Sequence, residues 1–256
     1  MFRSAIAALL CLATPALSFE MPNDLARAEF MPGWRDGNTH VAGLTIKMAP
    51  GWKTYWRAPG EGGIPPRFNW SGSSNVTNVE VRFPVPKVYN QNGLQSIGYS
   101  DQVTFPLVIT TRNGSAPVSI EGEINIGVCE EICVPVTLKL STTLPAVGSH
   151  DRGLAALLKN RPETGGGLAC EITPIADGLR MTAVATIQQM PGEEIAVIEI
   201  GDPEVWVSSP KLVRKGGKLS AEVEMVAPTA KPFALARSDV RMTVLAGGRA
   251  IEMLGC

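Results

Sequence analysis

Apolar and polar residues alternate along most of this chain, and this period of two limits the folds that the chain can adopt. In the first part, the alternation runs over residues 44–48, 79–83, 103–109, 118–128 and 134–140. Successive side chains of a strand point to opposite faces of a sheet, so each segment predicts a strand with one buried face. Gly and Pro, at 26 and 20 residues, separate these segments. We therefore expect an all-β fold built as an antiparallel β-sandwich.

The pattern changes near residue 150, where Ser149 is a candidate N-cap for a short helix over 151–160. The Gly-rich stretch that follows, 161–167, is typical of a linker. Strand patterns then return at 181–187, 196–200, 205–207, 219–225 and 240–245, with a hairpin turn expected at Lys215–Lys218. These features predict a sandwich over 19–148, a helix and linker over 149–167, and a second, smaller β domain over 168–256.

The first 18 residues have the pattern of a secretory signal peptide. A short basic region at 1–4 precedes an apolar run at 5–14, and Ala16-Leu17-Ser18 supplies the small residues of a cleavage site after about Ser18. Cys11 would leave with this peptide. No later apolar run approaches the roughly 18 residues that cross a bilayer. We therefore expect an exported protein that does not itself span the membrane.

Charge and histidine content exclude several classes of function. Lys and Arg number 23 against 24 Asp and Glu, and the chain has no long basic run, so nucleic acid is not an expected partner. The two histidines, His40 and His150, lie far apart and away from the cysteines, so no zinc site is expected. The nine Met residues are scattered. We expect no metal and no other cofactor.

Export to an oxidising compartment favours disulfides for the four remaining cysteines, which are Cys129, Cys133, Cys170 and Cys256. Three pairings are possible, and the simplest joins Cys129 to Cys133 and Cys170 to Cys256. The second bond would close about 85 residues and stabilise the fold by roughly 4 to 5 kcal/mol. Cys170 also shares the apolar parity of Leu168 and Ile172, which favours a structural disulfide.

The Cys129/Cys133 pair has a different character, because strand parity places both cysteines on the polar face. The pair encloses only three residues, so the gain in stability from loop closure is smaller. An exposed bond of this kind is readily reduced, and it can form a mixed disulfide with a partner that the second cysteine then resolves. Glu130 and Glu131 disfavour a thiolate here unless it is counter-charged. The alternative is a structural bond that pins the end of a hairpin.

Five motifs follow one another in the first half of the chain. They are Gly51-Trp52-Lys53-Thr54-Tyr55-Trp56-Arg57-Ala58-Pro59-Gly60 with Ile64-Pro65-Pro66, then Phe83-Pro84-Val85-Pro86, Gly98-Tyr99-Ser100-Asp101, Phe105-Pro106, and Gly127-Val128-Cys129 with Cys133-Val134-Pro135. Together they resemble the N-terminal periplasmic domain of the DsbD family over about residues 25 to 145. The resemblance is closest to the branch with the copper-tolerance protein ScsB, whose extended N-terminal region is similar to the second half.

The resemblance implies an immunoglobulin-like sandwich in the periplasm and a link to cytochrome c biogenesis and copper tolerance. Its cysteine pair would relay electrons from a membrane-embedded thiol donor to periplasmic thioredoxin-like proteins. The membrane and thioredoxin domains of DsbD are absent from this sequence, so the donor is expected to be a separate chain. The chain would then act as a protein-disulfide reductase component.

Roles carried over residue by residue give Cys133 as the cysteine that joins the partner and Cys129 as its resolving mate. The segment 89–97 corresponds to a cap loop over the pair. The residues expected to shield the pair are Tyr55, Leu94 and Tyr99. This chain departs from the best-known members in a shorter loop between the cysteines and in Lys53, which stands where a second tyrosine is usual.

Three classes of function are therefore open from the sequence. The first is a thiol–disulfide relay through Cys129 and Cys133. The second is a copper-handling protein that uses the same sulfurs as soft Cu(I) ligands. The third is a purely structural or ligand-binding β module.

Overall fold

The computed structural model describes residues 24–60, 62–91 and 93–256, and the prediction of an all-β chain is confirmed. The expected signal peptide lies outside the described residues. The strands of the first part are β1 (Ala26–Asp36), β2 (Thr39–Met48), β3 (Lys53–Tyr55), β4 (Arg67–Asn69), β5 (Val76–Val81), β6 (Lys87–Gln91), β7 (Leu94–Ser100), β8 (Gln102–Thr111), β9 (Val118–Cys129) and β10 (Cys133–Leu144).

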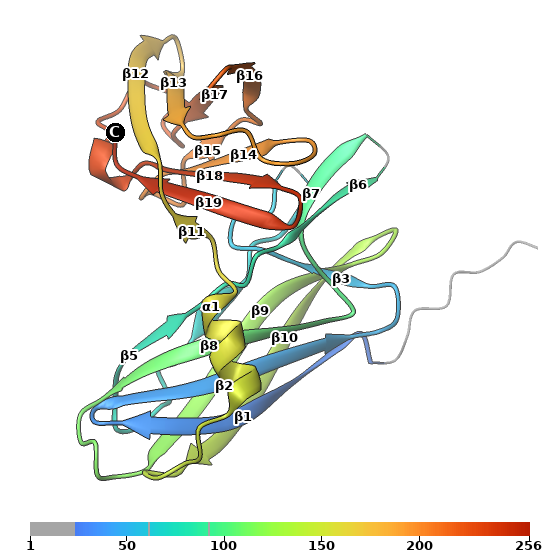
Figure 1. Cartoon of the computed structure of the whole chain (residues 1–256). Coiled ribbons are helices and arrows are strands. Elements are labelled where there is room, and N and C mark those ends of the chain that lie inside the picture. The colour runs from blue at the N-terminus through green and yellow to red at the C-terminus, as the bar shows by residue number, and fades with distance from the viewer. Residues whose placement is uncertain (1–23, 61, 92) are drawn as a thin grey trace, which may run out of the picture.

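Two antiparallel sheets form a sandwich from these strands (Figure 1). One sheet has the order β1-β2-β8-β5, and the other has the order β10-β9-β3-β7-β6 with β4 paired to β9. Their inner faces share one core, in which Leu44 and Ile46 of β2 meet Ile124 and Ile126 of β9. Alternate residues of β9 are buried as the sequence predicts, because only one face of the strand is turned to this core.

A single α-helix, α1 (Arg152–Lys159), follows the sandwich within the described residues and lies against the β1–β2–β8 sheet (Figure 1). Its N-cap is Asp151 and not Ser149, because the Asp151 carboxylate accepts a 2.8 Å hydrogen bond from the backbone nitrogen of Leu154. Leu154 is fully buried beside Gly33 and Gly43, so the helix is docked by one apolar side chain. No helix in the described part of the chain is long and apolar enough to cross a membrane.

The second part of the chain forms two further sheets. Its elements are β11 (Glu163–Thr164), β12 (Gly167–Ile175), β13 (Gly178–Thr186), β14 (Ile195–Glu199), β15 (Trp206–Val207), β16 (Lys211–Lys215), β17 (Lys218–Val226), the 3-10 helix η1 (Arg237–Asp239), β18 (Arg241–Ala246) and β19 (Arg249–Leu254). The sheet orders are β11-β19-β18-β14 and β12-β13-β17-β15, with β16 also paired to β17. The expected hairpin turn is confirmed by the pairing of Lys215 with Lys218. These sheets enclose a second apolar core.

The two parts of the chain meet at Arg57, which follows β3. Its guanidinium donates to both carboxylate oxygens of Glu199 at 2.9 and 3.0 Å and also to Glu252, while its carbon lies 4.1 Å from the ring centroid of Trp56. Arg241 is a second cation within 4 Å of both glutamates. The first core also includes three buried side chains from the second part, Val197, Leu245 and Ala250. The ion pairs therefore lie beside an apolar contact.

We expect Arg57→Met to destabilise the protein by about 2 to 3 kcal/mol, because it leaves two largely buried carboxylates with one cation. Urea unfolding measures this loss. The matched control is Arg249→Met, which breaks an exposed ion pair with Glu163 and should cost much less. Equal losses in the two variants would show that Arg57 is not central to the contact.

His40 is fully buried in β2 and is held by two neighbours. The Nε atom of Arg35 donates to His40 Nδ1 at 3.1 Å, so Nε2 carries the ring proton and donates to the carbonyl oxygen of Pro32. Burial is the largest influence on the ring and lowers the pKa of His40 below its ordinary value of 6.5, with Arg35 acting in the same direction and the Pro32 bond opposing both. Burial and these two hydrogen bonds are typical of a histidine with a structural role.

The lowered pKa of His40 predicts a loss of stability in mild acid. The unfolded chain takes up this proton at a higher pH than the folded protein, so the free energy of unfolding should fall as the pH drops below about 6.5 toward the folded-state pKa. Urea titrations at several pH values would measure the slope. His40→Gln should flatten the slope, and the control His150→Gln should retain it; an unchanged slope in His40→Gln would exclude this residue as the cause.

Candidate functional site

The Cys129–Cys133 disulfide closes the tip of the β9–β10 hairpin. The two cysteines are direct register partners with their Cα atoms 4.2 Å apart, and the pairing continues without a shift to Val118 and Leu144. Twelve residues on each strand thus hold the two sulfurs in place. The bond sits on a regular, extended hairpin, and the loop between the cysteines contains only residues 130–132.

The two cysteines differ in exposure, and this corrects the expectation that both face outward. Cys133 is exposed, whereas Cys129 is only 2% exposed. The reason is strand order. β9 has β3 as its neighbour on one side, with Lys53 opposite Cys129, whereas β10 is the edge strand of the sheet. Parity alone gives the face of a residue but not its distance from an edge.

Tyr55 is brought to the pair. Its hydroxyl oxygen lies 3.2 Å from the sulfur of Cys133 and 3.2 Å from the carbonyl oxygen of Gly62. Neither a disulfide sulfur nor a carbonyl oxygen carries a hydrogen, so the single hydroxyl proton of Tyr55 points to Gly62 or to Cys133, or is shared between them. Burial raises the pKa of Tyr55 above its ordinary value, which keeps this proton in place. The side chain can therefore donate a hydrogen bond to whatever form of sulfur Cys133 adopts.

Lys53 is the residue that sequence reasoning undervalued, since it was noticed only as a departure from a family pattern. Its side chain is 6% exposed, and its ammonium donates to the amide oxygen of Gln91 and lies 5.2 Å from the ring centroid of Tyr89. Burial lowers the pKa of Lys53, while the charge of Glu130 opposes that effect. The signal in the sequence is a charged residue inside the aromatic run from Trp52 to Trp56.

The other two residues expected to shield the pair are placed differently from each other. Leu94 is 52% exposed at the tip of the β6–β7 hairpin and lies near Gly62, whose carbonyl oxygen is 3.2 Å from the Tyr55 hydroxyl. Tyr99 is in the core, where its hydroxyl donates to the carbonyl oxygen of Pro84 at 2.8 Å and its ring meets Phe105 edge-on. Tyr99 pairs with Thr54, so it lies on the opposite face from Lys53 and Tyr55. It does not shield the pair.

Exposed apolar side chains lie on three of the segments near the disulfide. Ile64, Leu94 and Ile132 are three of the large hydrophobic residues that are exposed in the described chain. Ile132 is in the loop between the cysteines, Ile64 packs over Gly127 of β9, and Leu94 lies near Gly62. The surface near Cys133 therefore combines accessible apolar side chains with the acidic residues Glu130 and Glu131 of the loop between the cysteines.

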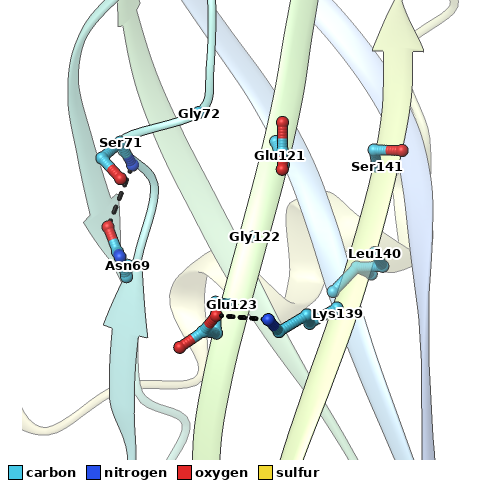
Figure 2. Close-up of a pocket in the computed structure, with 9 residues that line it drawn as sticks. All are labelled: Asn69, Ser71, Gly72, Glu121, Gly122, Glu123, Lys139, Leu140 and Ser141. Atoms are coloured by element: carbon cyan, nitrogen blue, oxygen red, sulfur yellow. Dashed lines mark hydrogen bonds and ion pairs between the residues drawn. The ribbon is translucent and has the colours of Figure 1, made fainter.

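A polar groove on the same hairpin has a different character (Figure 2). It has a volume of about 400 Å³, and an ion pair between Glu123 and Lys139 with a 3.1 Å separation crosses it. The lining contains no cysteine or histidine. The described residues also contain no group of three His, Cys, Asp or Glu side chains that could hold a metal ion.

The Cys170–Cys256 disulfide belongs to the second part of the chain and ties β12 to the last residue. Its Cα atoms are 5.4 Å apart, and both cysteines are half-buried against the second core. Arg237 donates to the Cys170 carbonyl oxygen at 2.7 Å, and its own carbonyl accepts from the Cys256 backbone nitrogen. This bond is a staple between segments that are distant in sequence.

We expect limiting dithiothreitol to open the Cys129–Cys133 bond before the Cys170–Cys256 bond. Cys133 presents an exposed sulfur to an attacking thiolate, and the second bond is half-buried. Alkylation of the freed thiols followed by peptide mass mapping would show the order. Simultaneous or reversed opening would contradict the difference in accessibility.

The chain is similar to known proteins both in sequence and in fold. Residues 23–145 match the family model described as "Thiol:disulfide interchange protein DsbD, N-terminal". Among solved structures, the chain is similar to the N-terminal periplasmic domain of ScsB from Proteus mirabilis. The match has 22% sequence identity and a TM-score of 0.66, and it covers 92% of this chain and 95% of that one. The expected immunoglobulin-like sandwich is confirmed by this shared fold. Curated protein sequences gave no match.

Proposed function

We propose that the first part of this chain, which belongs to the family of DsbD N-terminal domains, relays electrons by thiol–disulfide exchange through Cys129 and Cys133. The observation that carries the proposal is the asymmetry of the disulfide. Cys133 is exposed on the edge strand β10, with the Tyr55 hydroxyl beside its sulfur, and Cys129 is buried on the neighbouring strand β9. A bond that served only to pin a hairpin would need neither this difference in exposure nor a hydroxyl group beside the outer cysteine.

The chemistry follows from which sulfur a partner can reach. A donor thiolate attacks the sulfur of Cys133, the Cys129–Cys133 bond breaks, and its electron pair leaves on Cys129. A second donor thiol then releases the donor as a disulfide, and the protein holds two thiols. In the second half of the cycle, the Cys133 thiolate attacks an acceptor disulfide and Cys129 resolves the product. Two electrons and two protons pass from donor to acceptor.

We propose a membrane-embedded thiol protein as the donor and a periplasmic thioredoxin-like protein as the acceptor. Membership of the DsbD N-terminal family supports this pair in general terms. The exposed apolar side chains of Ile64, Leu94 and Ile132 fit a partner that docks largely through apolar contact. The low net charge of the chain is consistent with such docking. An exported, periplasmic location would place the pair where such partners work.

The relay predicts that Cys129→Ala accumulates a mixed disulfide through Cys133, because the resolving thiol is missing. Non-reducing gels of periplasmic extracts followed by mass identification of the linked protein would detect it. The matched control is Cys133→Ala, which leaves only the buried sulfur and should trap nothing. Recovery of both variants as unlinked protein would count against the relay, as would a potential below about −300 mV for the Cys129–Cys133 couple.

A further inference from the structure

We propose that Lys53 is the positioning residue for the resolving step, because its ammonium supplies the positive charge that stabilises the Cys129 thiolate. This proposal rests on the function proposed above and gives the two sulfurs separate supports. The Tyr55 hydroxyl lies beside the sulfur of Cys133, which binds the partner. Lys53 is the register partner of Cys129, whose sulfur completes the exchange.

β3 pairs with β9 at one position, where Lys53 is opposite Cys129. Opposed residues of antiparallel neighbours project from the same face of the sheet, with their Cβ atoms roughly 5 Å apart. Lys53 and Cys129 therefore extend side by side from one face. Tyr55, two residues further along β3, shares this face and reaches Cys133.

The charge of Lys53 is buried without a matched anion. Its side chain takes part in none of the ion pairs of the described residues, all of which join other cations to carboxylates. The amide oxygen of Gln91 and the ring of Tyr89 are neutral partners from β6, and Ser100 is its neutral register partner on β7. From the hairpin loop, Glu130 acts on it through space from beyond salt-bridge distance. A buried ammonium in such surroundings is costly unless an anion compensates it.

Reduction of the disulfide creates the missing anion. The oxidised pair is neutral, whereas the reduced pair can release a proton and leave a thiolate on Cys129, on the face of the sheet from which Lys53 extends. A nearby cation favours the thiolate and lowers the thiol pKa. Glu130 and Glu131 act in the opposite direction, so the lysine also offsets the acidic loop between the cysteines. The depressed pKa of Lys53 agrees with a site that lacks a counter-charge in its oxidised form.

The thiolate on Cys129 has a defined task in the exchange. In the mixed disulfide, the Cys129 sulfur attacks the Cys133 sulfur, and the bond from Cys133 to the partner breaks. Its electron pair leaves on the partner sulfur, which takes a proton from solvent. The rate of this step depends on the fraction of Cys129 present as thiolate. Loss of Lys53 should therefore slow release of the partner more than its capture.

The test measures the Cys129 thiol by itself. Cys133→Ala retains Cys129 as the free thiol when the second disulfide is intact, and the ultraviolet absorbance of the thiolate followed against pH gives its pKa. Adding Lys53→Met should raise this pKa by about one unit or more, which is about a tenfold smaller thiolate fraction at a fixed pH below the pKa. Lys53→Arg should restore the low value. Lys53→Gln serves in the same way if the methionine variant does not fold.

Two controls separate charge from structure. Gln91→Ala removes the hydrogen bond that ties Lys53 to the β6–β7 hairpin but leaves the charge, so the Cys129 pKa should stay low. Lys139→Met removes an exposed charge from the same hairpin and should also leave it low. An unchanged Cys129 pKa in both Lys53→Met and Lys53→Gln would overturn the proposal. The relay itself would fail in a different way, if the reduced wild-type protein transferred no electrons to a thioredoxin-like disulfide.

Discussion

The two faces of β9 have different roles: the side chains on one face pack in the core, and the other face carries Cys129 of the disulfide. The rest of the site depends on this arrangement. Ile124, Ile126 and Val128 hold the strand against the opposite sheet, while Cys129 ends it on the other face. Because the strand is fixed along its length, β3 on one side and β10 on the other meet the disulfide in a set geometry. β3 covers one sulfur, and the edge position of β10 exposes the other.

The second part of the chain is joined to this geometry through Arg57. The residue lies two positions after Tyr55, and its guanidinium is bound to Glu199 and Glu252 and stacked on Trp56. The segment that follows β3 is therefore held in place by Glu199 and Glu252, which belong to the second part of the chain. The β6–β7 hairpin also borders the second part of the chain, because Lys87 and Val88 line a pocket of about 380 Å³ together with residues of the β18–β19 turn. The second part thus borders two of the segments that surround the disulfide.

Local patterns predicted more of the fold than of the site. The alternation of apolar residues located the strands, the pairing of the cysteines followed from their spacing, and the hairpin at Lys215 followed from its two glycines. The burial of Cys129 could not be read in this way, because it depends on which strand is its neighbour. Tyr99 was expected to shield the pair, but its pairing with Thr54 places it on the face opposite to Lys53 and Tyr55. The contact of Arg57 with Glu199 spans 142 residues and has no local signature.

The register of the β9–β10 hairpin also has a kinetic consequence. Cys129 and Cys133 are opposed on strands that are paired over their full length, so opening the bond leaves both thiols facing each other on a preformed scaffold. Neither thiol has to search for the other, and the effective molarity of the pair is correspondingly high. Ring closure should therefore compete strongly with any bond between Cys133 and an outside thiol. A mixed disulfide between Cys133 and a partner would therefore be short-lived, and it would not accumulate during electron transfer.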